Sequence, residues 1–200
     1  DVHVRTIGGA RARGICGSGL IDAVAEMLRV GLLDETGRLV SPADARRALP
    51  DSLCRRLVET DRGYAFVLAG AGKLRVYLTQ QDVRKLQLAK GAISAGIRIL
   101  MKELDLQFAD VEEVLLAGAY GSYVDPASAR AIGLVPPFPL SRLVSVGNAA
   151  SVGARLALLS LDARREAEEI ASWVEHIELS SRPDFQDEFI SALYFPSSST

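Results

Sequence analysis

Three segments of the chain place glycines and other small residues beside apolar runs, a pattern that lets a ligand approach the backbone. They are residues 14–19 (GICGSG), 115–125 (LLAGAYGSYVD) and 147–154 (GNAASVGA). In α/β proteins a strand that ends in such a Gly/Ala turn forms one edge of a nucleotide crevice. Three edges of this kind predict one shared ligand, and the ligand class that fits them is a nucleotide.

The first segment has the chemistry of a phosphate loop. Free amides at a helix N-terminus favour a phosphate, and the Ser18 hydroxyl could add a donor beside Gly17 and Gly19. It is not a Walker A loop, because the Gly-Lys-Ser/Thr ending is missing. It is also not GxGxxG, because its glycines stand at 14, 17 and 19. A tight strand-to-helix turn with no ligand is the alternative, and this segment alone does not decide between them.

The other two segments could hold the base and ribose. The backbone at Gly118, Ala119 and Gly121 could form a ledge under them. Tyr120 and Tyr123 could wall that ledge, but aromatic residues near turns more often pack in the core or at its rim. Asn148 follows Gly147 and could reach the ligand, although capping of the next helix is the favoured assignment.

Further reactive groups have structural interpretations that we favour. Cys16 is expected to be a small packing residue rather than an activated thiol. Asp22, in the first helical turn, is expected to match the helix dipole, with Mg²⁺ binding through water as the alternative. Arg84, Lys85 and Lys90 are expected on a solvated helix face, although one of them could reach a phosphate.

Composition excludes several classes of function. The chain has 200 residues, is 48% hydrophobic and carries a net charge of -2, with no basic stripe for nucleic acid. Two cysteines without a CxxC motif give no disulfide framework, so a reducing, cytoplasmic compartment is expected. Apolar runs are too short to span a membrane. His3 and His176 have no partners at metal-ligand or triad spacing.

Residues 1–5 resemble a strand entered midway, so we expect a fragment of a longer polypeptide.

Hydrophobic periodicity places these segments on alternating strands and helices, which predicts an α/β sheet. A strand over residues 2–7 precedes a helix that opens at Ser18 or Gly19 and stops at Gly31. Residues 34–78 are expected to be an insertion with a basic helix over 43–57 and a hairpin of strands 64–68 and 74–78.

The second half of the chain begins with a long helix entered at Thr79, with Asp82 in the capping-box position. Its predicted apolar stripe is Val83, Leu86, Ala89, Ile93, Ile97, Leu100 and Met101, with Lys90 on the opposite side. The later elements are expected as a buried strand at 111–116, a strand at 143–146, a helix over 149–161 that packs closely on the sheet, a charged helix to 175, an edge strand at 176–179 and a helix over 183–193.

Taken together, these segments resemble the C-terminal part of the ATP-dependent reductive activators of corrinoid proteins. The resemblance is carried in order by residues 14–22 (GICGSGLID), 79–92 (TQQDVRKLQLAKGA), 116–125 (LAGAYGSYVD), 132–137 (IGLVPP), 146–150 (VGNAA) and 177–180 (IELS). It covers nearly the whole chain and is weakest between residues 34 and 75. Tyr120 and Ser122 depart from the family pattern, where Phe and Asn are expected.

The resemblance implies a ribonuclease-H-like, actin-like ATPase domain of the acetate-kinase, sugar-kinase and heat-shock ATPase superfamily. Its mixed sheet would be flanked by helices. Residues 1–33 and 79–200 would form the second of two such domains, and residues 34–78 an inserted helix and hairpin subdomain. Gly17, Ser18 and Gly19 would be the second phosphate loop. Gly118, Ala119 and Gly121 would form the adenosine motif, with Gly147 and Asn148 beside it. ATP and Mg²⁺ are the implied ligands, and no catalytic or metal-binding residue is assigned.

The implied activity is the reduction of an inactive Co(II) corrinoid to Co(I). ATP drives it, and the electron comes from an iron–sulfur domain outside these residues. The implied partner is a corrinoid protein or a corrinoid-dependent methyltransferase, and a homodimer is left open. Without the first domain, these 200 residues should bind ATP weakly and hydrolyse it negligibly. The alternatives are a small-molecule kinase of the same fold and a catalytically silent interaction domain. For the latter the insertion offers a candidate partner surface with Arg46, Arg47, Arg55 and Arg56, charges that more often only solvate a helix.

Overall fold

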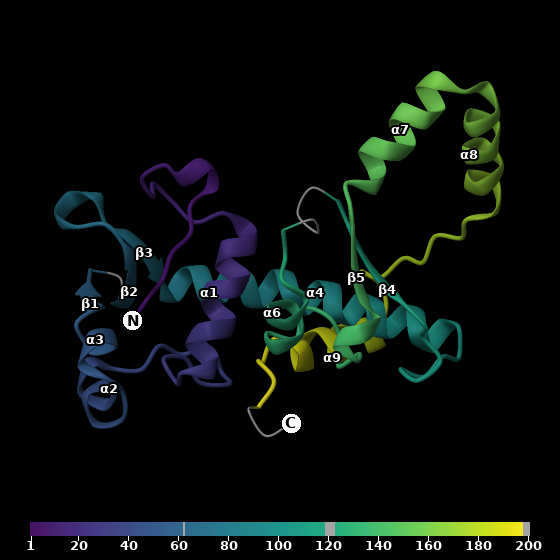
Figure 1. The fold of residues 1–200 in the computed structure, drawn as a ribbon. Coiled ribbons are helices and arrows are strands. Elements are labelled where there is room, and N and C mark those ends of the chain that lie inside the picture. The colour runs from purple at the N-terminus through teal and green to yellow at the C-terminus, as the bar shows by residue number, and fades with distance from the viewer. Residues whose placement is uncertain (62, 119–122, 198–200) are drawn as a thin grey trace.

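The computed structural model describes residues 1–61, 63–118 and 123–197. In these residues, helices and strands alternate along much of the chain (Figure 1). The helices are α1 (Gly17–Arg29), α2 (Pro42–Ala48), α3 (Asp51–Cys54), α4 (Gln80–Glu103), α6 (Pro126–Ala131), α7 (Ala149–Leu159), α8 (Leu161–Trp173) and α9 (Pro183–Ala192). The strands are β1 (Leu57–Thr60), β2 (Gly63–Ala69), β3 (Val76–Thr79), β4 (Val114–Ala117) and β5 (Leu143–Gly147). Single 3-10 turns lie at Ile7–Gly9, Gly72–Leu74 and Leu140–Arg142.

The region from 34 to 78 carries the first sheet, in which β1, β2 and β3 pair antiparallel in that order. Phe66 at its centre is paired with both Leu57 and Leu78, and all three side chains are buried. The predicted hairpin is therefore confirmed. The single basic helix predicted over 43–57 is wrong, because Pro50 has no N–H to donate and forces Leu49 into an extended conformation. The chain forms two short helices instead, followed by the unpredicted strand β1.

The second sheet consists of β4 and β5, which pair in parallel with Val114 opposite Leu143. One face of this sheet packs on the core through Val114, Leu116 and Leu143. The prediction of two strands here is confirmed, although β4 begins at Val114 rather than Val111. The expectation that β4 is fully buried is wrong, because Leu115 points to the opposite face and is exposed.

Helix α1 contacts α6 and α4 and supplies Ile21, Val24 and Met27 to the core. It ends at Arg29, and the predicted stop residue Gly31 follows two positions later with a φ of +75°, which suits glycine. The amides of Gly31 and Leu32 donate to the carbonyls of Leu28 and Met27 at 3.1 and 2.8 Å, which is the Schellman arrangement. The helix begins at Gly17, just before the predicted Ser18 or Gly19.

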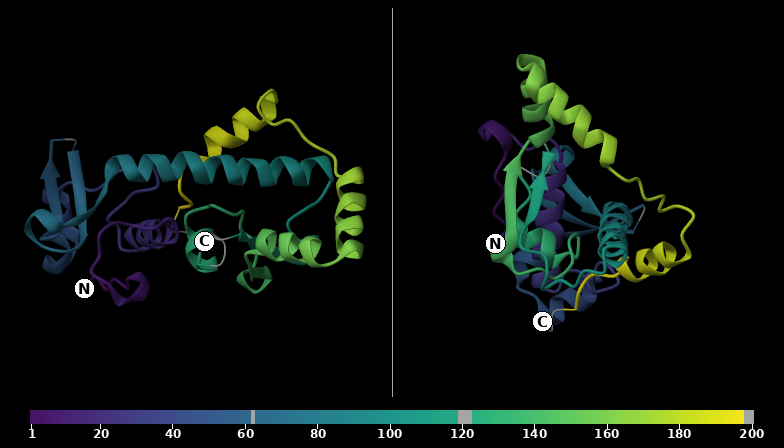
Figure 2. Two further views of the ribbon diagram at one scale, coloured as in Figure 1. Left: turned by 90° about the horizontal axis from the view of Figure 1, so that it is seen from above. Right: turned by 90° about the vertical axis from the view of Figure 1, so that its right-hand side faces the viewer.

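Helix α4 is the long spine of the molecule, and α9 packs alongside it (Figure 2). The capping box between Thr79 and Asp82 is confirmed in both directions. The predicted apolar stripe is only partly right. Val83 and Leu86 are buried, but Ala89, Ile93 and Leu100 are exposed. The buried face instead carries Gln87, Lys90, Gly91, Ser94, Ala95 and Ile99, because the C-terminal segment supplies hydrogen-bond partners to this side of the helix.

Several edge elements differ from the sequence-based expectations. Residues 2–6 have no regular secondary structure and Ile7 begins a 3-10 turn, so the predicted strand at 2–7 does not form. Residues 174–179 likewise run as a loop rather than an edge strand. The predicted helix over 183–193 is confirmed as α9. Helix α7 does not pack closely on a sheet, since none of its residues is buried, and α7 and α8 stand away from the body as a pair (Figure 1). No helix among the described residues is long and apolar enough to cross a membrane.

Candidate functional site

The N-terminus of α1 is built on a cysteine cap. Sγ of Cys16 accepts a hydrogen bond from the Gly19 amide at 3.4 Å and lies 3.5 Å from Oγ of Ser18. The hydrogen bond with Ser18 is the larger cause and the bond from the Gly19 amide the smaller one, and both lower the pKa of the Cys16 thiol. Cys16 is exposed, so the expectation that it is a packing residue is wrong. It is the N-cap residue of α1, and its sulfur accepts a hydrogen bond at the N-terminus of that helix. Gly17 and Ser18 precede the first intrahelical bond, from Leu20 N–H to the Cys16 carbonyl.

The ends of β4 and β5 form the second part of the site. Their register pairs Ala117 with Gly147, which brings Gly118 and Gly147 to the same edge of the sheet. Both glycines have positive φ, +100° and +71°, a conformation that L side chains rarely adopt. Ala119 and Gly121, with Tyr120 and Ser122, lie outside the described residues.

Asn148 follows at the start of α7. Its Oδ1 accepts a hydrogen bond from the Ser151 amide at 3.1 Å, which confirms the favoured capping assignment. Its Nδ2 is a separate donor that capping does not use. Tyr123 is 78% exposed, so the expectation that it packs in the core or at the rim is wrong.

Asp22 differs from its expected role as a first-turn carboxylate. The first turn of α1 has no acidic residue, and Asp22 lies in the second turn, facing α6. Burial raises its pKa, the carboxyls of Asp125 and Glu26 add to the rise, and a hydrogen bond with Ser128 opposes it. Within the described part of the chain its buried Oδ1 has no hydrogen-bond partner. No group of three or more His, Cys, Asp or Glu side chains that could hold a metal ion occurs among the described residues.

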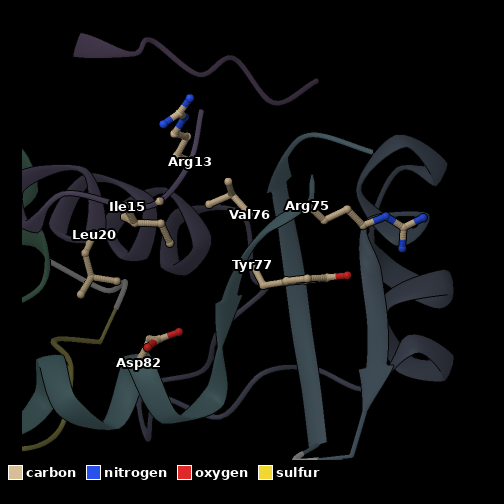
Figure 3. Close-up of a pocket in the computed structure, with 8 residues that line it drawn as sticks. Arg13, Ile15, Leu20, Arg75, Val76, Tyr77 and Asp82 are labelled. Atoms are coloured by element: carbon tan, nitrogen blue, oxygen red, sulfur yellow. The ribbon is translucent and has the colours of Figure 1, made fainter. Parts of the chain in front are cut away.

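A cavity of about 360 Å³ lies beside the first glycine segment (Figure 3). Residues from the α1 entrance, β3 and the start of α4 line it: Arg13, Gly14, Ile15, Leu20, Arg75, Val76, Tyr77 and Asp82. Only Gly14 and Ile15 belong to a segment that the sequence singles out as a site. Arg13, Arg75 and Tyr77 were missed, because the two walls are some sixty positions apart in sequence and no local motif joins them.

Lys90 is not on a solvated face. It is 1% exposed, its ammonium donates to the Tyr194 carbonyl, and it lies 4.9 Å from the centroid of the Phe195 ring. Burial lowers its pKa to about 8. Gln87 lies beside it and donates to the carbonyls of Leu193 at 2.8 Å and Thr36 at 3.0 Å. Lys90 therefore holds the C-terminal segment on α4 and is not placed to reach a phosphate.

Two more of the predicted cationic groups have structural partners. Arg84 donates to the Thr36 carbonyl at 2.6 Å and to Oε1 of Gln87 at 2.8 Å. Within the insertion, Arg56 donates to the carbonyls of Val67 and Leu68 at 3.0 and 3.1 Å. Arg56 thus joins α3 to β2, which leaves Arg46, Arg47 and Arg55 as the exposed members of the expected partner surface.

Comparison with known protein families gives a match over the whole chain. Residues 1–200 match the family described as the C-terminal domain of RACo, the ASKHA domain. The chain belongs to this family. The solved structure of a protein named "Reductive activator for corrinoid,iron-sulfur protein" superimposes on this RACo C-terminal domain with a TM-score of 0.85 at 37% identity, covering 96% of this chain and 30% of that one.

Two curated relatives extend the comparison. The chain is 36% identical over 188 residues to the "Corrinoid activation enzyme RamQ" of Eubacterium limosum, covering 92% of this chain and 31% of that protein. It is 26% identical over 189 residues to the "[Co(II) methylated amine-specific corrinoid protein] reductase" of Methanosarcina barkeri, covering 94% and 30%. The chain thus spans less than a third of each relative. Membership confirms the predicted actin-like ATPase fold and implies that the domain binds a nucleotide.

Proposed function

We propose that this domain is the nucleotide-binding half of an ATP-dependent reductive activase that reduces a Co(II) corrinoid to Co(I). The observation that carries the proposal is the register between β4 and β5, which sets Gly118 beside Gly147 and Asn148 at one sheet edge. The names of the relatives supply the substrate class, since they describe corrinoid activation, corrinoid protein reduction and reductive activation. The partner is a corrinoid protein or a corrinoid-dependent methyltransferase.

The residue roles follow from the chemistry of each turn. Gly17, Ser18 and Gly19 take a phosphate through the α1 amides and the Ser18 hydroxyl. The backbone of Gly118, Ala119 and Gly121 is assigned to the adenosine in this proposal. Gly147 lets the backbone come close to the ligand, and Nδ2 of Asn148 donates to it. Mg²⁺, when bound with ATP, neutralises phosphate charge.

The same proposal includes the boundaries of the domains. Residues 1–33 and 79–200 form the second actin-like ATPase domain, and residues 34–78 form its insertion. The first domain and an iron–sulfur domain that supplies the electron lie outside these residues. ATP favours one arrangement of the two ATPase domains, and it shifts the corrinoid partner only by its differential affinity for the two arrangements. The protein works in the cytoplasm, and a homodimer remains part of the proposal.

Isothermal titration of the full-length protein with Mg-ATP tests this assignment. Ser18→Ala removes the proposed phosphate donor, and we expect the affinity for Mg-ATP to fall by about tenfold, the loss of one good hydrogen bond. Ser172→Ala is the matched control, because that hydroxyl donates to the Glu169 carbonyl at 2.6 Å on α8. Binding equal to that of the wild type in both variants would contradict the role of Ser18. No heat at saturating Mg-ATP would favour a silent interaction domain, and transfer of phosphate to a small molecule would favour a kinase.

A further inference from the structure

Helix α6 connects the two segments to which the proposed function assigns the phosphate and the adenosine. It begins at Pro126, directly after the segment 118–125, and it packs beside α1, whose first turn contains residues 17–19 (Figure 1). The placement of α6 against α1 therefore sets how far the end of one segment lies from the other.

The C-terminal end of α6 is closely packed. Gly133 follows the helix, and a Cβ at this position would lie 3.2 Å from Cδ of Pro196 and 3.5 Å from Nζ of Lys90. Ala129, inside the helix, is completely buried, and so is Ile132 at its end. With this end fixed, the contact that the first turn of α6 makes with α1 decides how the two helix starts are placed relative to each other.

The first turn of α6 meets α1 at Asp22. Asp125 caps α6 by accepting a hydrogen bond from the Ser128 amide at 2.8 Å. The side chain of Ser128 in turn forms a hydrogen bond with the Asp22 carboxylate. Asp22 lies about one turn after Gly19 on α1. A side-chain contact thus joins the helix that follows residues 118–125 to the helix that begins at residues 17–19.

Stability alone does not account for a carboxylate at this position. Oδ1 of Asp22 is buried and has no hydrogen-bond partner in the described part of the chain. The carboxyl groups of Asp125 and Glu26 also lie close enough to repel the charge of Asp22. A buried acceptor without a partner and nearby like charges both destabilise the folded state. Residues that break the rules of stability in this way are expected mainly at functional sites.

We propose that Asp22 is a positioning residue that, through Ser128, holds the segment 118–125 at a fixed separation from residues 17–19. This role rests on the proposed function, because one nucleotide must contact both segments. A ligand that spans two binding groups gains affinity when their placement is fixed, since binding to the first presents the ligand to the second at a high effective concentration. Loss of the Asp22 contact therefore weakens a ligand that spans both segments and spares ligands that occupy one of them.

Three ligands distinguish this role from a general structural one. Mg-ATP spans both segments, adenosine occupies one and Mg-tripolyphosphate the other, and each is titrated into the full-length protein. For Asp22→Ala we expect the affinity for Mg-ATP to fall by about tenfold, while the affinities for adenosine and tripolyphosphate stay within about twofold of the wild type. An equal loss for all three ligands would overturn the proposal, and so would an unchanged affinity for Mg-ATP.

Glu26→Ala is the matched control for this comparison. Glu26 is an exposed carboxylate on the next turn of α1, and its ion-pair partner is Arg29 of the same helix at 2.6 Å. Its removal takes a carboxylate from α1 and leaves the contact with Ser128 in place. We expect the three affinities to be those of the wild type, and a loss for Mg-ATP equal to that of Asp22→Ala would overturn the proposal.

Two further variants test the contact itself. Asp22→Asn keeps an oxygen that can accept from Ser128, so we expect it to bind Mg-ATP nearly as the wild type does. Ser128→Ala removes the other side of the contact and should reproduce the loss seen in Asp22→Ala, with no larger loss in the double variant. Additive losses would overturn the proposal. If thermal unfolding shows that Asp22→Ala does not fold, Ser128→Ala carries the three-ligand comparison.

The wild-type titration separates this proposal from the proposed function. Absence of Mg-ATP binding to the full-length wild type would contradict the proposed function as well. Normal binding by the wild type, with Asp22→Ala and Ser128→Ala both equal to it, would overturn only the role of Asp22.

Discussion

At the scale of single residues, the proposed nucleotide site depends on side chains that also hold the fold, and Asn148 shows how the two roles can be separated. Its Oδ1 caps α7, while Nδ2 remains as the donor for a ligand. Asn148→Asp keeps a capping oxygen but replaces the Nδ2 donor by an acceptor oxygen beside the proposed adenosine position. We therefore expect unchanged stability but Mg-ATP affinity lowered by about tenfold or more in calorimetry.

Asn148→Ala is the comparison for that experiment. It removes the cap and should lower the free energy of unfolding by about 1 kcal/mol. If Asn148→Asp bound Mg-ATP as the wild type does, the residue would be a cap only, and the donor role would be withdrawn.

Lys90 makes stability depend on pH. Burial lowers its pKa from 10.5 to about 8, so between these values the unfolded chain binds more protons than the folded one. Stability from this group should therefore rise as the pH increases from about 8 to about 10, as the desolvation cost of the charged form is removed. Thermal unfolding of the wild type and of Lys90→Met across this range measures the effect. The wild type should gain stability relative to the variant, and parallel curves would contradict the pKa shift.

At the scale of elements, the sequence predicts correctly those helix ends and turns that a few neighbouring residues determine. The capping box at Thr79 and Asp82, the glycine stop at Gly31 and the hairpin about Gly70 are examples. Burial of α4 could not be predicted in this way. Periodicity put Lys90 on the solvent side, but the carbonyls of Leu193 and Tyr194, a hundred positions away, make a polar face of the helix the buried one.

The geometry of the candidate site could be predicted only in part for the same reason. Glycine turns at 14–19, 118 and 147 are visible as local patterns, and the parallel register then joins two of them. The cavity between Arg13 and Tyr77 has no local signature, because its walls come from elements that are distant in sequence. For α7, small residues suggested close packing on a sheet, yet none of its residues is buried and the helix contacts α8 instead.

The end of α1 offers a test at the scale of an element. Gly31→Ala places a Cβ on a residue with a φ of +75°, and we expect a loss of about 1 kcal/mol in the free energy of unfolding. No atom lies within 4 Å of the added Cβ, so strain in the backbone rather than a clash is the cause. Gly31→Asn should recover much of that loss, because Asn tolerates positive φ. Equal losses in the two variants by chemical denaturation would contradict this cause.

At the scale of the whole molecule, the domain has an actin-like ATPase fold and covers less than a third of its relatives. In the proposed function, a nucleotide bound at the edge formed by Gly118, Gly147 and Asn148 acts on a corrinoid only by favouring one arrangement of the full-length protein over another. ATP should therefore control the extent of cobalt reduction rather than supply the electron.

The most direct measurement follows cobalt in the visible spectrum. The full-length protein is mixed with a corrinoid protein in the Co(II) state and a low-potential electron donor, and Mg-ATP is then added. We predict that the Co(I) spectrum appears only after Mg-ATP is added, and that Ser18→Ala slows its appearance. Formation of Co(I) at the same rate and to the same extent without nucleotide would contradict the proposed function.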